Sequence, residues 1–290
     1  MNRIYDLITW LFDPLHHLYE HQKVHQKISI ALVLLFLSSL LVIELKRQQL
    51  LPEQLSSMVP ENHFYAISGA FTVILILEVI SLIFTLPCSF SRSVGKQFEI
   101  LALILIRNSF KELSYFQEPV TFIGNEESIL HILSNGFGAF VIFALLGVYY
   151  ILQDKTEDER DNIDNIYSFV AAKKGISLIL LAFFFGMGIR SLYLSTAGIA
   201  HTNFFHDFYT LLIISDILVV LVSQCFHPSF YTIFRNSGFA LSTMIIRLAL
   251  VAPVYFNVLL GVTAIILSIL LTAISGRMFP NNEKHHDSNG

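Results

Sequence analysis

Long apolar runs alternate with short polar stretches along most of the chain. A run of about 20 apolar residues, rising 1.5 Å per residue as a helix, crosses a hydrocarbon core of roughly 30 Å. The pattern therefore predicts an all-α integral membrane protein with about eight transmembrane helices. The predicted spans cover residues 28–45, 65–86, 94–113, 129–152, 175–194, 203–226, 235–252 and 253–275.

Two of these spans, 94–113 and 235–252, carry an Arg and several polar residues, so each is either a full span or a re-entrant segment. An internal repeat argues for treating them alike. Glu78 and Asp216 lie near the middle of two apolar runs, 138 positions apart, and Arg107 and Arg247 lie 140 positions apart. With full spans, each half becomes a four-helix unit of the same orientation, so the axis relating the halves should run along the membrane normal.

The repeat and the polar stretches between spans define five expected regions of the chain. The N-terminal region has Ile4, Leu7, Ile8 and Leu11 on one helical face, with Asp13-Pro14 expected to end or kink that helix. It lacks the uninterrupted apolar core and cleavage site of a secretory leader. The expected regions are a cytoplasmic amphipathic interfacial segment (1–27), a first four-helix repeat (28–152), a charged cytoplasmic linker (153–174), a second four-helix repeat (175–277) and a disordered tail (278–290).

Composition and charge agree with a membrane location. The chain is 54% hydrophobic, and its 14% of charged residues is well below the roughly 25% of soluble domains. With the N-terminus inside, twelve Lys and Arg residues, Lys173 among them, lie on the cytoplasmic side and six on the outer side. Positive charge favours the cytoplasmic side, so both termini are predicted to be cytoplasmic, in a bacterial inner membrane.

The charges inside the predicted spans carry most of the functional information. An unpaired carboxylate at the bilayer centre costs about 2.5–3.5 kcal/mol on insertion scales, so such a group faces the bundle interior and has a partner. The spacing allows Glu78 to pair with Arg107 and Asp216 with Arg247. These pairs either fix helix register as structural ion pairs or line a path between the halves, where the carboxylates couple to a proton or cation.

Histidines form a second candidate site, on the predicted external face. His63 and His201 begin equivalent spans, His206 and Asp207 follow His201, and His131 begins the fourth span. Imidazole suits zinc, copper, iron or nickel, so these residues are candidates for an external metal or pH-sensing site. The sequence leaves open whether they bind a metal or haem, and it indicates no cofactor.

The sequence contains no CxxC, HExxH, GxGxxG, GxxxxGK[ST] or GxSxG motif, so nothing supports a zinc hydrolase, a nucleotide-binding enzyme or a serine hydrolase. We therefore expect no enzymatic activity. A net charge of −4 also disfavours nucleic acid as a partner. The expected partners are the lipid bilayer, a proton, cation or small solute, and either a second copy of the chain or another protein.

The second half also resembles a voltage-sensor domain. SDILVVLVSQ places an acid in one helix, and FRNSGFALSTMIIRLALVAP places Arg in the next. Voltage sensors carry Arg or Lys at every third position of their fourth helix, whereas Arg235 and Arg247 are twelve apart on the third helix of this half. We do not assign the chain to that family. The favoured function is a transporter or channel, and the alternative is a non-transporting membrane scaffold or sensor, loosely similar to a voltage sensor, that contacts a partner.

Overall fold

The computed structural model of the protein describes residues 2–50, 52, 59–116, 121–153, 163–196, 204–226 and 230–278, and these residues contain helices and no strand. Each of the eight predicted spans corresponds to a helix, and a further helix precedes them. The elements are α1 (Asn2–Glu20), α2 (Gln22–Arg47), α4 (Tyr65–Thr85), α5 (Phe90–Glu112), the 3₁₀ turn η1 (Leu113–Tyr115), α6 (Glu126–Gln153), α7 (Ile163–Thr196), α8 (Phe204–Phe226), α9 (Phe230–Val251) and α10 (Phe256–Met278).

Six of the described helices are long and apolar enough to cross a membrane: α2, α4, α6, α7, α8 and α10. Helices α5 and α9 are of similar length but less apolar. Both lie among other helices, α5 against α4, α6 and α9, and α9 against α5, α8 and α10. A helix enclosed in this way tolerates polar side chains, because its neighbours, not lipid, surround them.

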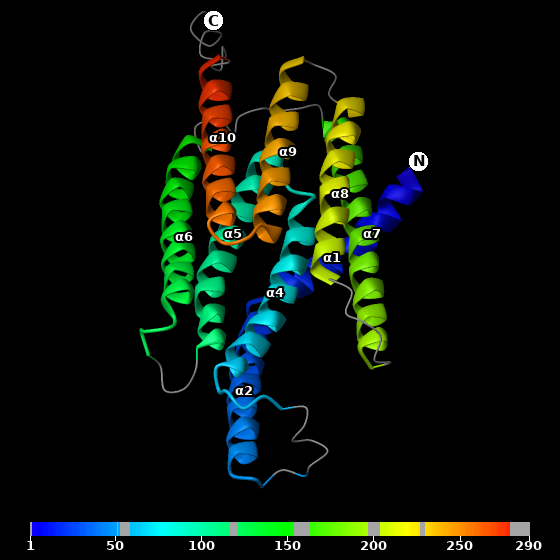
Figure 1. Ribbon diagram of the computed structural model, residues 1–290. Helices are drawn as coiled ribbons and strands as arrows, with labels where there is room; N and C mark the ends of the chain where they lie inside the picture. The colour runs from blue at the N-terminus through cyan, green and yellow to red at the C-terminus, as the bar shows by residue number, and fades with distance from the viewer. Residues whose placement is uncertain are drawn as a thin grey trace, which may run out of the picture.

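Helices α4 to α10 form an antiparallel bundle in which successive helices run in opposite directions (Figure 1). One hydrophobic cluster joins α5, α6, α9 and α10, and it contains Phe98, Leu101, Ile142, Ile246 and Ile265. A second cluster joins α4, α7 and α8. The turn between α4 and α5 lies at the same end of the bundle as the C-terminal ends of α6, α8 and α10.

Helices α6 and α10 approach each other closely. A Cβ atom added at Gly138 would overlap the side chain of Val258, so glycine is what allows this approach. Beside it, Asn257 Nδ2 donates a 2.8 Å hydrogen bond to Asn135 Oδ1, and both residues are buried. Small residues and interhelical hydrogen bonds are the usual means of holding helices together in lipid, where apolar side chains gain little from leaving the bilayer.

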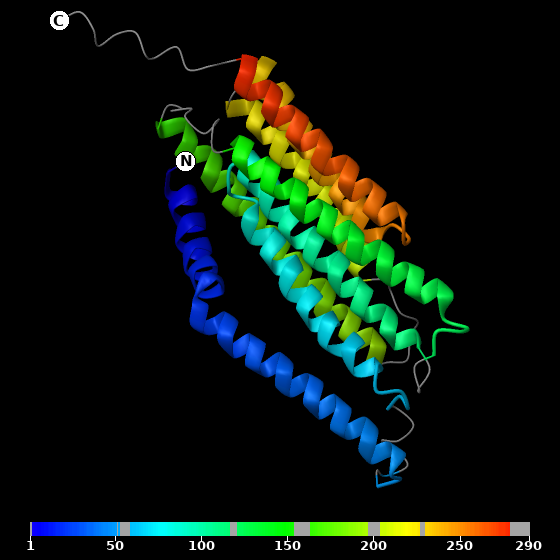
Figure 2. The same cartoon turned by 90° about the vertical axis from the view of Figure 1, so that its left-hand side faces the viewer.

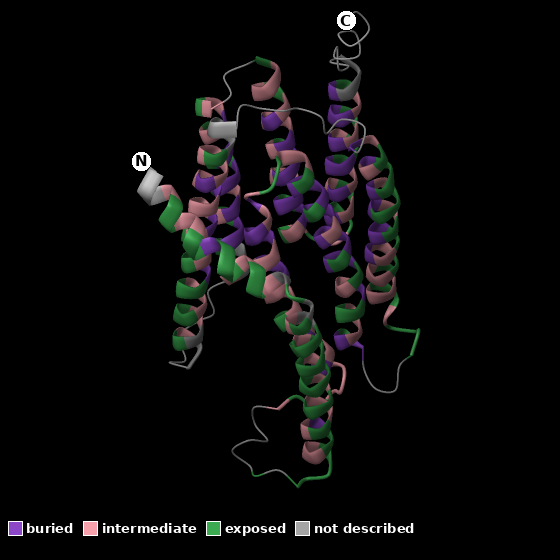
Figure 3. Ribbon diagram, turned by 180° about the vertical axis from the view of Figure 1, so that it is seen from behind, coloured by how far each residue is buried: buried purple, intermediate pink, exposed green. Residues whose placement is uncertain are grey.

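Helix α2 stands apart from this bundle. Only 6% of its most apolar segment is buried inside the protein, and its main packing contacts are with α4 and α1. Figure 2 shows it running beside the bundle, and Figure 3 shows that most of its residues are exposed. Its C-terminal end has polar contacts with the segment before α4: His63 Nε2 lies 3.2 Å from Glu44 Oε2, and Lys46 Nζ lies 3.7 Å from Glu61 Oε1.

Helix α1 extends beyond the expected stop at Asp13-Pro14. It continues through Pro14 to Glu20, and α2 begins at Gln22, inside the segment expected to precede the first span. Contacts with α4 support the continuation: the rings of Phe12 and Tyr19 pack on Phe84, and Tyr19 Oη donates a 3.0 Å hydrogen bond to Leu77 O. Burial also raises the pKa of Tyr19, so this phenol stays neutral.

The same helix presents an apolar surface away from the bundle. Leu7, Trp10, Leu11 and Leu18 are exposed, while Phe12 is buried. Two of the four residues expected on the apolar face, Leu7 and Leu11, therefore point away from the protein, as lipid contact requires. The interfacial position of this helix stays a prediction.

Helix α7 begins at Ile163, well before the expected start of the fifth span at residue 175. Its first turns pack on α1. Tyr167 Oη donates a 2.8 Å hydrogen bond to Asp6 Oδ1, and Lys174 Nζ lies 2.6 Å from Asp13 Oδ1. The second part of the expected linker is therefore helical and attached to α1. Residues 154–162 and 279–290, which hold the rest of the linker and nearly all of the expected tail, lie outside the described residues.

Candidate functional site

The two predicted acid–arginine pairs form in the structure. In the first half, Glu78 on α4 makes an ion pair with Arg107 on α5. Glu78 is buried, whereas the Arg107 side chain keeps 23% of its surface exposed. Arg107 lies near the C-terminal end of α5, and its long side chain spans the remaining distance to the acid. The spacing argument is confirmed for this pair, and its role in ion coupling stays a prediction.

In the second half, Asp216 on α8 faces Arg247 on α9, with 3.6 Å between Oδ2 and Nε. The Arg247 side chain is fully buried, and Asp216 is 6% exposed. Within the described part of the chain, Asp216 Oδ2 and the three guanidinium nitrogens have no hydrogen-bond partner. The charges attract each other, but the geometry leaves polar atoms unsatisfied, which is costly in a low-dielectric interior.

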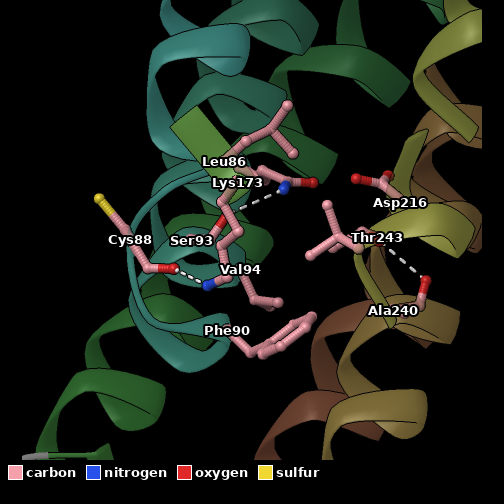
Figure 4. A pocket seen from close by; sticks show the side chains of 11 residues that line it. Leu86, Cys88, Phe90, Ser93, Val94, Lys173, Asp216, Ala240 and Thr243 are labelled. Carbon is pink, nitrogen blue, oxygen red and sulfur yellow. Dashed lines mark hydrogen bonds between the residues drawn. The ribbon is translucent and has the colours of Figure 1, made fainter. Parts of the chain in front are cut away.

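Asp216 also lines a cavity of about 20 Å³, which is enough for roughly one water molecule. The cavity lies where the α4–α5 turn and α5 meet α7, α8 and α9, and Figure 4 shows side chains from both halves around it. It therefore lies between the two halves. The lining residues are Leu86, Cys88, Phe90, Ser93, Val94, Gln97, Lys173, Asp216, Val219, Ala240 and Thr243.

Two oxygen acceptors of the polar lining have no hydrogen-bond partner in the described part of the chain. Gln97 is 1% exposed, and its Nε2 donates a 3.3 Å hydrogen bond to Ser93 Oγ. That bond leaves Gln97 Oε1 buried with no partner, like Asp216 Oδ2 on the same cavity. Thr243 Oγ1 donates a 2.8 Å hydrogen bond to Ala240 O and also lies within hydrogen-bonding reach of the Asp216 carboxylate. A protonated carboxyl, a water molecule or a small cation between Gln97 and Asp216 would satisfy both acceptors.

Lys173 is the functional candidate that sequence reasoning missed, because its charge was assigned to the solvated cytoplasmic side. It is 2% exposed, and its Nζ donates a 2.7 Å hydrogen bond to Cys88 O, as drawn in Figure 4. The ammonium lies 4.4 Å from the ring centroid of Phe169 and 4.8 Å from that of Phe90. The sequence feature that could have identified Lys173 is Phe169, one helical turn earlier. Aromatic and cationic side chains at i, i+4 meet on a helix, so Phe169 could cover the Lys173 ammonium.

The predicted external histidines do not come together in the described residues. His63 lies 3.2 Å from Glu44 and 3.4 Å from Arg47, while His131 lies 3.5 Å from Glu112 and packs on the ring of Tyr255. No group of three or more His, Cys, Asp or Glu side chains in the described ranges is arranged to hold a metal ion.

The remaining members of that predicted set are only partly described. His201 lies outside the described residues, His206 is described only as part of the backbone of α8, and Asp207 is exposed in its first turn. His63 and His131 thus have separate carboxylate partners, Glu44 and Glu112. They support two local ion pairs rather than one shared site.

Comparison with known proteins gives no match, since no protein-family model, no curated protein and no solved structure matches this chain. Function must therefore be argued from the site itself.

Proposed function

We propose that this protein is a membrane transporter that couples movement of a proton, cation or small solute to a change of charge on Asp216. The observation that carries the proposal is the cavity between the halves, lined by Asp216 and Gln97, each of which has a buried oxygen without a hydrogen-bond donor among the described residues. Ionisable residues inside a membrane protein commonly mark ion or proton pathways. Binding of a proton or a cation at Asp216 satisfies the acceptors, and release restores the attraction of Arg247.

The architecture supports this proposal. We infer that α2, α4, α5 and α6 form one four-helix repeat and α7, α8, α9 and α10 the other, giving eight spans. Counterparts meet under this scheme, because α5 packs on α9 and α6 packs on α10. Such contacts are expected near a twofold axis between parallel repeats, and binding sites in many transporters lie at the repeat interface. The cavity is lined by residues of both proposed repeats, as expected for a site at their interface.

We further propose that both termini are cytoplasmic and that the membrane is the bacterial inner membrane. The two cysteines of the chain, Cys88 and Cys225, are both exposed and form no disulfide. They lie at the end of the bundle assigned to the cytoplasm. A membrane-impermeant maleimide should therefore label both in inside-out vesicles and neither in right-side-out cells. Single variants Cys88→Ser and Cys225→Ser assign the signals, and labelling of the two cysteines from opposite sides would contradict the proposed spans.

Flux in proteoliposomes tests transport directly. Purified protein is reconstituted with a pH-sensitive dye inside, and uptake is driven by imposed proton, sodium or potassium gradients. We expect Asp216→Asn to reduce ion-dependent flux to that of protein-free vesicles, because the amide keeps the shape of the side chain and removes its charge. Asp207→Asn is the matched control, since Asp207 is an exposed acid on the same helix. Full flux in the Glu78→Gln, Asp216→Asn double variant would overturn the transport mechanism.

A non-transporting scaffold or sensor is the second candidate function. One observation favours it: both buried acids have an Arg partner, as structural ion pairs do. On that account, α1 and the start of α7, joined through Asp6 and Asp13, provide the surface for a partner. It predicts no flux in the natural protein, and it predicts that removing Asp216 together with Arg247 leaves a folded protein.

A further inference from the structure

Lys173 differs from the other charges in the bundle core because it has no carboxylate partner among the described residues. Glu78 pairs with Arg107 and Asp216 with Arg247, which leaves Lys173 as the additional cation. In the described part of the chain, its ammonium contacts the Cys88 carbonyl and the rings of Phe90 and Phe169. Such an arrangement holds a cation in place without neutralising its charge.

Lys173 and Asp216 line the same cavity from opposite halves of the protein. The lysine approaches from α7 beside the α4–α5 turn, and the acid approaches from α8 (Figure 4). The four-carbon stem of lysine is flexible, and its ammonium can rotate three donors toward a new acceptor. Among the described residues, Asp216 Oδ2 has no hydrogen-bond partner, although it lies 3.6 Å from Arg247 Nε.

We propose that Lys173 is a tethered cation that competes with the transported ion for Asp216. When Asp216 holds its proton or cation, Lys173 stays on the Cys88 carbonyl, as in this structure. When the ion leaves, the ammonium crosses the cavity and pairs with the carboxylate. The inference rests on the proposed function for the identity of the competing ion, and it adds to Arg247 a second cation that binds the empty carboxylate in competition with that ion.

The ionisable groups around the cavity limit which residues take part. Lys173 comes from α7, the Cys88 thiol from the α4–α5 turn and Asp216 from α8, while Arg247 of α9 lies behind Asp216 with Tyr209 in electrostatic range. Helix α5 contributes only the neutral Ser93 and Gln97. Arg247 is already beside the acid, so Lys173 is the cation on this cavity that gains a carboxylate by moving.

The competition predicts how Lys173 affects protonation of Asp216. A cation that reaches the deprotonated carboxylate stabilises it, so removing that cation should make Asp216 bind protons more tightly. Infrared difference spectra of the reconstituted protein, recorded during a pH titration, report the protonated carboxyl. Asp216→Asn serves as the blank that assigns the band. We expect Lys173→Met to reach half-protonation at about tenfold lower proton concentration than the natural protein, as an opposite charge within reach typically produces.

Lys174→Met is the matched control, because Lys174 is adjacent on the same helix but pairs with Asp13 on α1. It should leave the midpoint within about threefold, since its charge is paired elsewhere and does not line the cavity. Lys173→Arg keeps the charge and should stay closer to the natural protein than Lys173→Met. If Lys173→Met does not fold, Lys173→Gln provides the neutral variant.

Equal midpoints for Lys173→Met and Lys174→Met would overturn the competition, as would the absence of a titrating Asp216 band in every variant. The titration needs no flux, so it separates the two proposals. A Lys173-dependent midpoint in a protein that moves no ion would contradict the proposed function and leave the Lys173–Asp216 exchange standing. Ion flux in a protein whose midpoint does not depend on Lys173 would support the proposed function and contradict the Lys173–Asp216 exchange.

Discussion

The two halves of the protein place the same residue types at matching positions and surround them differently. The Glu78–Arg107 pair keeps 23% of the Arg side chain exposed, whereas Arg247 beside Asp216 is fully buried. The cavity adjoins Asp216, and Glu78 is not among its lining residues. Each half therefore contains a buried acid paired with an Arg, but the surrounding helices decide whether the acid faces a cavity.

The first helix of each half explains part of this difference. Helix α2 lies at the side of the bundle and is mostly exposed, whereas α7 packs on α8, α4 and α1. Helix α7 also brings Lys173 into the cavity. In the second half, α7 packs on the other helices and carries Lys173. In the first half, α2 lies at the side and has an exposed apolar surface. We infer that the first pair mainly fixes structure and that the second exchanges an ion.

The largest expected effect comes from removing the buried guanidinium. Arg247→Met leaves Asp216 buried without its partner, which should reduce the free energy of unfolding by about 3–5 kcal/mol. Arg107→Met should cost less, about 1–3 kcal/mol, because its side chain is partly exposed and lies between the surface and buried cases. Reversible unfolding in mixed micelles measures both. Equal losses would show that the two pairs have equivalent environments.

Double variants sharpen the same contrast. Asp216→Asn combined with Arg247→Met removes both charges, so it should recover much of the stability that Arg247→Met loses. Coupling between contacting charges is typically about 0.5–3 kcal/mol, and we expect the Asp216–Arg247 cycle to give a larger value than the Glu78–Arg107 cycle. Unfolding free energies of the four members of each cycle provide the measurement. A larger coupling in the first half would contradict our assignment of roles.

Packing between the halves gives the next effect in size. Gly138→Ala places a methyl group where the Val258 side chain lies, so α6 and α10 must separate, at a cost of about 1–3 kcal/mol. Gly147→Ala on the same helix meets no atom within 4 Å and should be neutral or stabilising by up to about 1 kcal/mol. Thermal unfolding compares the two. A harmless Gly138→Ala would mean that α6 and α10 do not pack as described.

The smallest expected effect concerns the cavity lining. Gln97→Leu removes an acceptor that faces the proposed ion, which should lower ion flux about tenfold, or ~1.4 kcal/mol in the activation barrier. The position 140 residues later, Ser237, does not line the cavity, so Ser237→Ala should leave flux unchanged. Initial rates in proteoliposomes give the ratio. Equal rates for the two variants would remove Gln97 from the site.

Much of the helical arrangement follows from the sequence, because apolar length and depth are local properties. The eight runs predicted the eight helices from α2 to α10, and equal spacing in two copies predicted the pairs Glu78–Arg107 and Asp216–Arg247. Boundaries were less accurate. Helix α1 passes through Pro14 because Phe12 and Tyr19 pack on α4, a tertiary contact that local propensity does not report.

The cavity and its lysine could not be predicted in this way. Lys173 belongs to a stretch rich in charges, and its contacts come from the α4–α5 turn at Cys88 and from Phe90 of α5, which are distant in the sequence. Gln97 is one of several polar residues on α5, and the sequence left open whether this segment crosses the membrane or is re-entrant. Its significance comes from facing the same cavity as Asp216, 119 positions later in the chain. Sequence spacing identified the charges, whereas packing determines which of them faces a cavity.

The central claim is that Asp216 exchanges an ion and that Glu78 does not. Infrared difference spectra of the natural protein, Glu78→Gln and Asp216→Asn between two pH values test it most directly, because they observe the carboxyl groups themselves. We predict a carboxyl band that changes with pH, survives Glu78→Gln and disappears in Asp216→Asn. A band that disappears in Glu78→Gln and survives Asp216→Asn would contradict the account.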